Sequence, residues 1–237
     1  MKSAVRTPFF EIGVKNYLYG DAVVELAWAA DGAAAEYDID ILFITPYVDI
    51  RRIAECTDRL IILAPYMDTL RPGRGLADVL PEGLKAAGAH GVVINHAERP
   101  VPLAQIRQTI DRANELDLLT FACADTVDDA RAIAVYRPDI LNPEPSALIG
   151  SGRTGGLDFM RASTEAIQAV SSQTLVEQGA GIATADQVHQ YIAAGADGVG
   201  VASGIVGVGD PIGQLATMLE AFVDARALRP SPTKLGR

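Results

Sequence analysis

Three side chains that could carry acid–base chemistry each follow closely on a run of apolar residues. They are Lys15, His96 and Glu144. Removal of a proton from a carbon next to a carbonyl group needs a carboxylate, together with hydrogen-bond donors or a cation where negative charge develops on the oxygen. One carboxylate, one imidazole and one ammonium group meet that need, provided that the fold brings them to one place.

Each of these residues also has a simpler interpretation. Lysines are mostly exposed, so Lys15 taken alone is typical of an ordinary solvated lysine. His96 taken alone is equally typical of a hydrogen-bonded structural histidine. Glu144 is more distinctive, because it stands between Pro143 and Pro145 and the two rings hold its backbone stiffly. Such a position is unusual for a glutamate that only solvates the surface.

Glycine-rich segments follow the last apolar runs. Gly179-Ala180-Gly181 and Ser203-Gly204 each come between an apolar run and a predicted helix, and such turns can direct backbone N–H groups at a phosphate. Plain tight turns are the alternative interpretation. The stretch 148–156, which follows Glu144, contains four glycines and predicts a lid, with a long surface loop as its alternative.

Strand-like and helix-like segments alternate along the chain. Most of the strand-like runs are continuously apolar, as in parallel strands that are covered on both faces. The predicted strands are Phe9–Val14, Ile39–Ile44, Leu60–Leu63, Gly91–Asn95, Leu118–Cys123, Asp139–Leu141, Thr174–Glu177 and Gly198–Val201. The predicted helices are Asp21–Ala35, Val48–Cys56, Pro81–Ala87, Pro102–Asn114, Val127–Tyr136, Asp158–Ser171, Ala185–Ala194 and Pro211–Ala227.

These units predict an α/β protein with a closed (β/α)8 barrel. No element is left over, so one domain over residues 1–237 is expected. Residues 228–237, with Pro230 and Pro232 and little to bury, predict a flexible tail. Active sites of such barrels lie at the C-terminal ends of the strands. The three acid–base residues and the glycine-rich turns are therefore expected at one mouth of the barrel.

Composition excludes several classes of protein. The 237 residues include 30 acidic and 20 basic side chains, and the formal net charge is −10. An acidic surface repels polyphosphate, so a nucleic-acid partner is not expected, although backbone N–H groups can still hold one small phosphate. No apolar run reaches the roughly 18–20 residues of a membrane span, and no secretory signal is apparent. A cytoplasmic protein without a membrane partner is expected.

Cysteine and histidine usage argues against a metal centre. Cys56 and Cys123 are the only cysteines, too few for a disulfide scaffold or a cysteine metal cage. A metal site at strand ends would draw on several His and carboxylate ligands, whereas only His96 among the three histidines is expected at the mouth. We therefore expect neither a metal nor a cofactor.

Four motifs together resemble a known family. They are Ile94-Asn95-His96-Ala97-Glu98, Glu144–Gly152, Gly179-Ala180-Gly181-Ile182 and Ala202-Ser203-Gly204. Their order and spacing are similar to the triosephosphate isomerase family, in its short archaeal-type branch, over about residues 8–225. The resemblance implies a TIM barrel that isomerises a phosphorylated aldose or ketose. It also implies a homodimer or homotetramer.

The resemblance also implies a role for each site residue. Glu144 matches the base that moves a proton between adjacent carbons through an enediolate, and His96 matches a neutral imidazole that hydrogen-bonds the carbonyl oxygens. Lys15 matches the cation beside the oxyanion and the phosphate. Glu98 and Asn95 match structural residues near the site. The residues that match the substrate and phosphate grip are Gly152, Gly179, Gly181, Ser203 and Gly204.

Two positions depart from the family pattern. The family places an asparagine two residues before the lysine, and this chain has Gly13 there. Asn16 is adjacent to Lys15, but strand alternation predicts that it points to the opposite side. A family threonine that reaches the partner subunit's site is matched here by Leu76. Both departures affect the wall around the substrate.

Three functions therefore follow from the sequence. The first is triosephosphate isomerase activity on glyceraldehyde 3-phosphate and dihydroxyacetone phosphate. The second is isomerisation of a larger sugar phosphate, such as a tetrulose phosphate, in the room that Gly13 leaves. The third is a non-catalytic sensor of a phosphorylated ligand on the same barrel.

Overall fold

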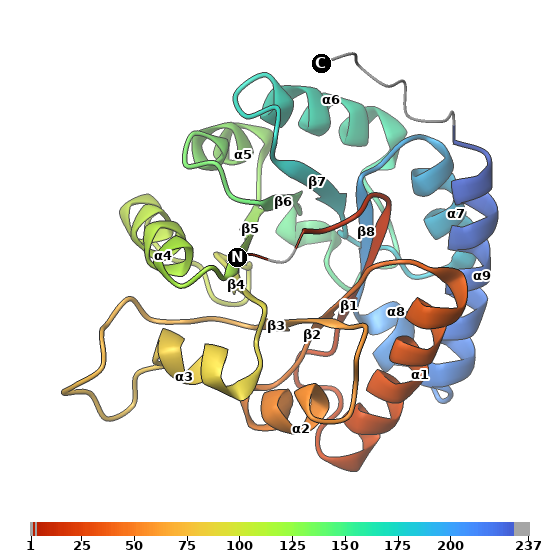
Figure 1. Ribbon diagram of the computed structural model, residues 1–237. Coiled ribbons are helices and arrows are strands. Elements are labelled where there is room, and N and C mark those ends of the chain that lie inside the picture. Colours follow the sequence, from red (N-terminus) through yellow and green to blue (C-terminus); the bar gives the residue numbers. More distant parts are fainter. Residues whose placement is uncertain (1, 3, 230–237) are drawn as a thin grey trace, which may run out of the picture.

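Parallel strands close into a barrel at the centre of the molecule (Figure 1). The computed structural model describes residues 2 and 4–229. Each strand pairs with its neighbours in the sequence, and β1 also pairs in parallel with β8, which closes the ring. The strands are β1 (Phe9–Gly13), β2 (Ile41–Ile44), β3 (Ile61–Ala64), β4 (Gly91–Ile94), β5 (Leu119–Ala124), β6 (Ile140–Pro143), β7 (Leu175–Gln178) and β8 (Gly198–Val201).

Helices surround the barrel on its outside (Figure 1). The α-helices are α1 (Asp21–Tyr37), α2 (Ile50–Ala54), α3 (Pro81–Ala87), α4 (Leu103–Glu115), α5 (Val127–Ala134), α6 (Gly156–Gln168), α7 (Ala185–Ala193), α8 (Ser203–Val206) and α9 (Pro211–Ala227). Two short 3-10 helices are η1 (Tyr47–Asp49) and η2 (Ser146–Leu148). A capping box begins α7, because the Thr184 and Gln187 side chains each accept from the other residue's backbone N–H.

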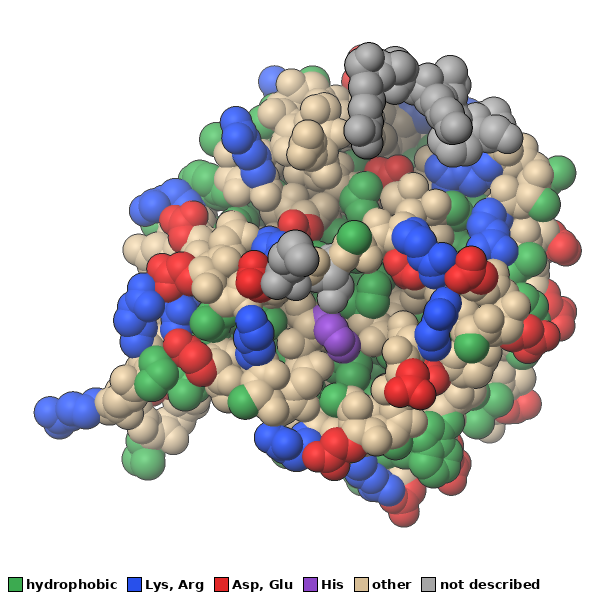
Figure 2. Space-filling view, in the orientation of Figure 1, with side chains coloured by type: hydrophobic (Ala, Val, Ile, Leu, Met, Phe, Trp, Pro, Cys, Tyr) green, Lys and Arg blue, Asp and Glu red, His purple; other side chains and the backbone are tan. Residues whose placement is uncertain are grey.

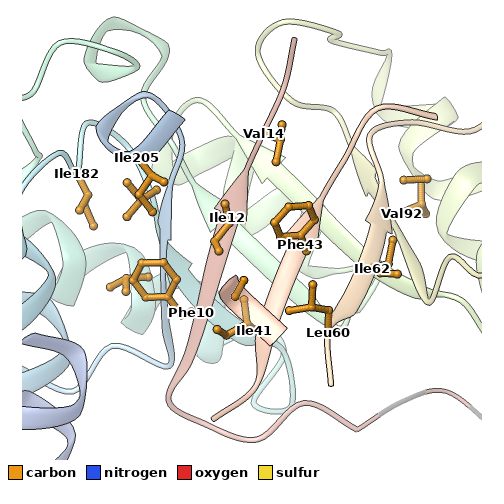
Figure 3. Packing of buried hydrophobic residues seen from close by; sticks show 14 of the residues in the cluster. Phe10, Ile12, Val14, Ile41, Phe43, Leu60, Ile62, Val92, Ile182 and Ile205 are labelled. Atoms are coloured by element: carbon orange, nitrogen blue, oxygen red, sulfur yellow. The ribbon is translucent and has the colours of Figure 1, made fainter. Parts of the chain in front are cut away.

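In most strands, alternating residues belong to two different hydrophobic clusters. Phe10, Ile12 and Val14 lie in the outer cluster, which fills the space between the strands and the helices (Figure 3). Phe9 belongs to the inner cluster, inside the barrel, and its ring occupies the space that a side chain on Gly198 would need. Glu11 follows Phe9 by two residues, so strand alternation directs its side chain into the barrel as well.

The observed elements confirm the predicted barrel. Every predicted strand is present, with its ends shifted by at most two residues. The predicted helix over 48–56 is divided into η1 and α2, and the sequence pattern gives no sign of η2 or α8, which are too short to show a helical period. Within the described part of the chain, no helix is long and apolar enough to cross a membrane. The flexible tail predicted for 228–237 lies almost wholly outside the described residues.

One segment extends away from the barrel. It joins β3 to α3 and stands clear of the other elements in Figure 1, and Figure 2 shows both basic and hydrophobic side chains on it. Its Leu76 side chain is fully exposed, at 101%. The base of the segment is held by Arg112 of α4, which donates to the Leu70 carbonyl over 3.4 Å and forms an ion pair with Glu82.

Candidate active site

A cavity of about 520 Å³ opens at the C-terminal ends of the strands. This volume lies within the usual range for small-molecule sites. Most of the residues predicted for the site line it, namely Lys15, His96, Glu98, Glu144, Gly179, Gly181 and Ser203. Asn95, Gly152 and Gly204 do not line it. The barrel therefore brings the three acid–base side chains together, as the sequence predicts.

Glu144 is the buried carboxylate of this cavity. Its backbone N–H donates to the Ala124 carbonyl over 2.7 Å, which continues the pairing of β5 with β6 past Pro143 and fixes the direction of the side chain. Only 11% of the side chain is exposed. Burial raises the pKa of Glu144 to about 7, against the opposing charge of Lys15. A carboxylate with this pKa can both accept and return a proton near neutral pH.

His96 presents a neutral imidazole to Glu144. The backbone N–H of Glu98 donates to His96 Nδ1 over 3.1 Å. Because Nδ1 accepts, the proton of the neutral ring is assigned to Nε2. Nε2 lies 3.4 Å from Glu144 Oε2. Burial and the charge of Lys15 both lower the pKa of His96, so the ring stays neutral and presents an N–H donor to the cavity.

Lys15 and Glu98 form an ion pair at the cavity wall. Lys15 Nζ donates to Glu98 Oε1 over 2.9 Å, and the two side chains are 21% and 61% exposed. Burial acts to raise the pKa of Glu98, but the hydrogen bond and charge of Lys15 outweigh it and the net change is downward. Glu98 thus touches both the imidazole and the cation, through its backbone and its side chain respectively.

Asn95 holds the end of β4 from outside the cavity. Its backbone is in the left-handed region, at φ 62°, which asparagine tolerates better than most residues. Its Nδ2 donates to the Cys123 carbonyl over 3.0 Å, and its Oδ1 accepts from the Val101 N–H over 3.0 Å. These bonds tie β4 to β5 and to the following loop, and so they orient His96, the next residue.

Gly181 allows the glycine-rich segment after Glu144 to pack against the loop after β7. Its φ of +75° is in the left-handed region. A Cβ at this position would overlap the Arg153 carbonyl oxygen and lie 2.9 Å from the Leu148 carbonyl oxygen. Any side chain here would therefore push the segment away from the cavity wall.

The same segment contributes Ile149 and Gly150 to the cavity lining. Gly152 lies farther out, where its carbonyl accepts from Gln187 Nε2 over 3.1 Å. Because Gln187 also caps α7, this bond links the segment to the start of that helix. In this structure Gly152 is held on the outer side of the segment.

Ser203 and Gly204 begin a helix and do not form a turn before one. The prediction of a turn is wrong here, because both residues belong to the short helix α8. Ser203 lines the cavity. A Cβ on Gly204 would lie 2.7 Å from the Ala183 Cα, so this glycine permits close packing of α8 on the loop after β7. The backbone N–H groups of Ser203 and Gly204 belong to the first turn of α8, and such groups have no partner within their own helix.

Gly13 leaves space beside Lys15, and Asn16 lines the same cavity. The prediction that Asn16 points to the opposite side is wrong, because β1 ends at Gly13 and Lys15 adopts a left-handed conformation, at φ 50°. Strand alternation does not apply beyond that point. A Cβ on Gly13 would lie 3.2 Å from Glu11 Oε1 and 3.3 Å from the Ala202 Cβ.

Several lining residues are not found from motifs. Tyr17, Tyr47, Tyr66 and Arg99 form part of the wall, and the Arg99 guanidinium lies 4.3 Å from the centre of the Tyr66 ring. Glu11 and Asn142 line the inner end of the cavity, and Glu177 is fully buried on the inner face of β7. Glu11 has a signal in the sequence, because it interrupts an otherwise apolar strand. Asn142 and Glu177 have none, because each is followed by a residue, Pro143 or Gln178, that ends its strand.

The cavity offers no evident metal centre. Among residues 2 and 4–229 there is no group of three or more His, Cys, Asp or Glu side chains that could hold a metal ion. Both cysteines are free; Cys56 is exposed, whereas Cys123 is buried and faces the cavity from β5.

Fold and site together define a class: a (β/α)8 barrel whose strand ends direct a buried carboxylate and a neutral imidazole at one small polar cavity. Comparisons with known proteins agree with this class. The family model described as "Triosephosphate isomerase" matches residues 12–221. The chain therefore belongs to the triosephosphate isomerase family, as its motifs predict.

Individual relatives match nearly the whole chain. Triosephosphate isomerase of Methanobacterium bryantii is 35% identical over 216 residues, which are 89% of this chain and 95% of that protein. The enzyme of Sulfurisphaera tokodaii is 32% identical and covers 85% and 90% of the two chains. That of Cenarchaeum symbiosum is 32% identical and covers 92% and 99%. These archaeal relatives confirm the predicted branch of the family.

Proposed function

We propose that the chain is an aldose–ketose isomerase that interconverts glyceraldehyde 3-phosphate and dihydroxyacetone phosphate. The observation that carries this proposal is the distance of 3.4 Å between Glu144 Oε2 and His96 Nε2. It places a base and a neutral N–H donor next to each other on the wall of one cavity. Membership of the family supports the same activity, because its relatives carry that name.

Proton transfer between adjacent carbons follows from this arrangement. The Glu144 carboxylate takes a proton from the carbon next to the carbonyl group, a carbon–carbon double bond forms, and the electron pair moves to the carbonyl oxygen. His96 Nε2–H donates to that oxygen, and Lys15 balances its negative charge. Glu144 then returns the proton to the carbon that bore the carbonyl group, while the proton of the neighbouring hydroxyl group passes by way of His96 Nε2 to the former carbonyl oxygen, so that the new carbonyl group forms on the other carbon. No oxidant, reductant or cofactor enters this balance.

The phosphate of the substrate is proposed to lie against Gly179, Gly181 and Ser203, which border the cavity at the ends of β7 and β8. Gly204 supports that wall, and Gly152 reaches the phosphate when the segment after Glu144 closes. Closure excludes water from the enediolate, which otherwise loses its phosphate. Asn95 and Glu98 are positioning residues in this scheme.

Replacement of the base tests the proposal. Glu144→Gln keeps the shape of the side chain but cannot accept the proton, so we expect kcat to fall by several orders of magnitude while a phosphorylated inhibitor still binds. Glu144→Asp withdraws the carboxylate and should also lower kcat strongly. Glu220→Gln is the matched control, since Glu220 is exposed on α9. Near-wild-type turnover by Glu144→Gln would refute the assignment of the base.

A sensor of a phosphorylated ligand is the competing function. Exchange of the carbon-bound proton with solvent deuterium separates the two, because a sensor binds the sugar phosphate without exchange. The paired Glu144 and His96 favour the isomerase. We further propose that the protein acts in the cytoplasm as a homodimer or homotetramer.

A further inference from the structure

Two glutamates meet inside the barrel below Glu144. Glu11 is 6% exposed and Glu177 is fully buried. A Cβ built on Gly200 of β8 would overlap Glu177 Oε1 and lie 2.5 Å from Glu11 Oε2. Both oxygens therefore converge on the same point beside β8. We call the two residues the carboxyl floor: Glu11 lines the cavity, and Glu177 lies behind it.

The carboxyl floor carries both hydrogen-bond donor and acceptor capacity. Two carboxylates this close in a buried place cannot both be ionised, so at least one proton stays on the pair. Burial raises the pKa of each carboxyl well above its ordinary value; the charge of Glu144 adds to the rise at Glu11, and the charges of Glu11 and Glu144 add to it at Glu177. A protonated carboxyl group donates through its O–H, and an ionised one accepts. A hydroxyl group, which also donates and accepts, is a complementary ligand for such a pair.

Polar atoms of the floor, and of Asn142 beside it, have no hydrogen-bond partner among the described residues. Glu11 Oε1, both carboxyl oxygens of Glu177 and Asn142 Oδ1 are buried without a hydrogen bond among the described residues. Buried polar groups are otherwise nearly always hydrogen-bonded, and leaving them unpaired costs stability. Ordinary packing gives no reason to keep them. A ligand that enters from the cavity does, because Glu11 and Asn142 line it.

Small residues keep the path to the floor open. Gly13 and Gly200 both line the cavity. The missing side chain of Gly200 makes room for the floor oxygens themselves, and the missing side chain of Gly13 leaves space next to Glu11 Oε1. Glu11 lines the same cavity as Glu144 and Lys15, and the charges of both act on its carboxyl. A substituent that reaches the floor would thus belong to the carbon chain beside the reacting carbons. The phosphate end of the substrate is instead assigned to β7 and β8.

We propose that the carboxyl floor binds a substrate hydroxyl, and that the site accepts phosphorylated aldoses and ketoses with one hydroxyl-bearing carbon more than a triose. The inference rests on the proposed isomerase function and adds a substrate class to it. Glu11 and Glu177 are then specificity residues, and Gly13 provides the access.

The test compares two substrates in one assay. Isomerisation of D-erythrose 4-phosphate and of glyceraldehyde 3-phosphate is followed by NMR in deuterated water for the wild type and for Glu11→Leu. We expect the wild type to isomerise both. The ratio of kcat/KM for the four-carbon substrate to that for the three-carbon substrate should fall by about tenfold or more in Glu11→Leu, since a hydrogen-bonded hydroxyl loses its partner.

A second variant keeps the test decisive if Glu11→Leu does not fold. Gly13→Ala leaves both glutamates in place, but its methyl group lies 3.2 Å from Glu11 Oε1 and obstructs a hydroxyl that approaches the floor. The same ratio should fall. Thermal unfolding of each variant is measured first, and if Glu11→Leu does not fold, Gly13→Ala decides the question.

The outcomes that follow contradict either this inference or the proposed function. An unchanged ratio of the two kcat/KM values in the folded variants refutes the floor as a specificity site. An equal loss of kcat/KM on both substrates refutes it too, because the floor would then bind an oxygen that both substrates share. A wild type that isomerises only the triose phosphate refutes this inference but leaves the proposed function standing. Failure of the wild type to isomerise either substrate refutes the proposed function, and this inference with it.

Discussion

At the level of single residues, burial reverses the order in which the Glu144 carboxyl and the His96 imidazole titrate in water. Burial raises the pKa of Glu144 to about 7 and lowers that of His96, because burial disfavours the charged form of either side chain. A carboxylate gains basicity in this way, and an imidazole remains a neutral donor. Above pH 7 both groups are in the forms that the proposed proton transfer needs.

A pH profile tests these titrations. Since Glu144 must be ionised to act as a base, kcat/KM should fall by about tenfold per pH unit below pH 7 and level off above it. The measurement is initial rate against pH in buffers of constant ionic strength. An acidic limb centred near the ordinary glutamate pKa of 4.5 would contradict the burial argument.

The raised pKa of Glu144 also makes the stability of the protein depend on pH, in the opposite direction to the activity. A pKa raised in the folded state means that the protonated form favours folding, so this contribution is present below pH 4.5 and is lost as the pH rises through about 7. Glu144→Gln removes the titrating group. Its free energy of unfolding should therefore vary less between pH 4.5 and 7 than that of the wild type, as measured by urea denaturation.

At the level of the elements, the loops that follow the strands position the wall of the site, and the loop after β7 is an example. Gly181→Ala should destabilise the protein and raise KM for the phosphorylated substrate, because the new methyl group displaces the Arg153 carbonyl and the segment that carries it. Thermal unfolding and steady-state kinetics measure the two effects.

Gly195→Ala is the matched control for that variant. Gly195 also has a left-handed backbone, at φ +105°, but a Cβ there would meet nothing within 4 Å. Both substitutions carry the backbone strain of a side chain at positive φ, roughly 1–2 kcal/mol. Only Gly181→Ala should raise KM. An equal rise in KM for both variants would show that strain alone, without displacement of the segment, accounts for the change.

Sequence patterns predict the elements well because their signal is strong. Largely apolar runs bounded by turn residues locate every strand, although not the full length of β6, and Pro81 and Pro211 mark the first turns of α3 and α9. The exception at β6 has a physical reason. Its pairing with β5 continues through Asn142 and Pro143, two residues whose types argue against a strand.

The site is predicted less completely than the fold. Glu144, His96 and Lys15 are found because each follows a strand, where barrel sites are expected. Glu11 and Glu177 lie within strands, and an apolar run indicates a strand without revealing which of its residues face the axis. The register of β1 with β8, in which Glu11 lies opposite Gly200, shows which residues face the axis, and the sequence pattern does not contain that register.

At the level of the whole molecule, the charge of −10 is carried by a mixed surface. Figure 2 shows acidic and basic side chains interspersed over the face that it presents, without a continuous basic surface. This agrees with the expectation that nucleic acid is not a partner. The cationic group of the site, Lys15, is largely buried and paired with Glu98, so it contributes little to the outside.

The segment between β3 and α3 gives a test of assembly. Leu76 is fully exposed on it, and a large apolar side chain on a segment that extends into solvent favours contact with a second copy of the chain. We expect Leu76→Arg to weaken self-association by at least about tenfold in sedimentation velocity. Val135→Arg, at another exposed apolar position directly after α5, should leave it intact. A monomeric wild type would refute the proposed oligomer.

The pairing of β1 with β8 also has a consequence for the nascent chain during translation. The first strand to leave the ribosome has its second neighbour near the other end of the chain, since Phe9 pairs with Gly198. At about 5–20 residues per second, synthesis leaves that edge of β1 open for roughly ten seconds or longer. An open strand edge invites pairing with other chains. The nascent protein should therefore depend on chaperones until β8 emerges, and chains truncated before β8 should aggregate during translation.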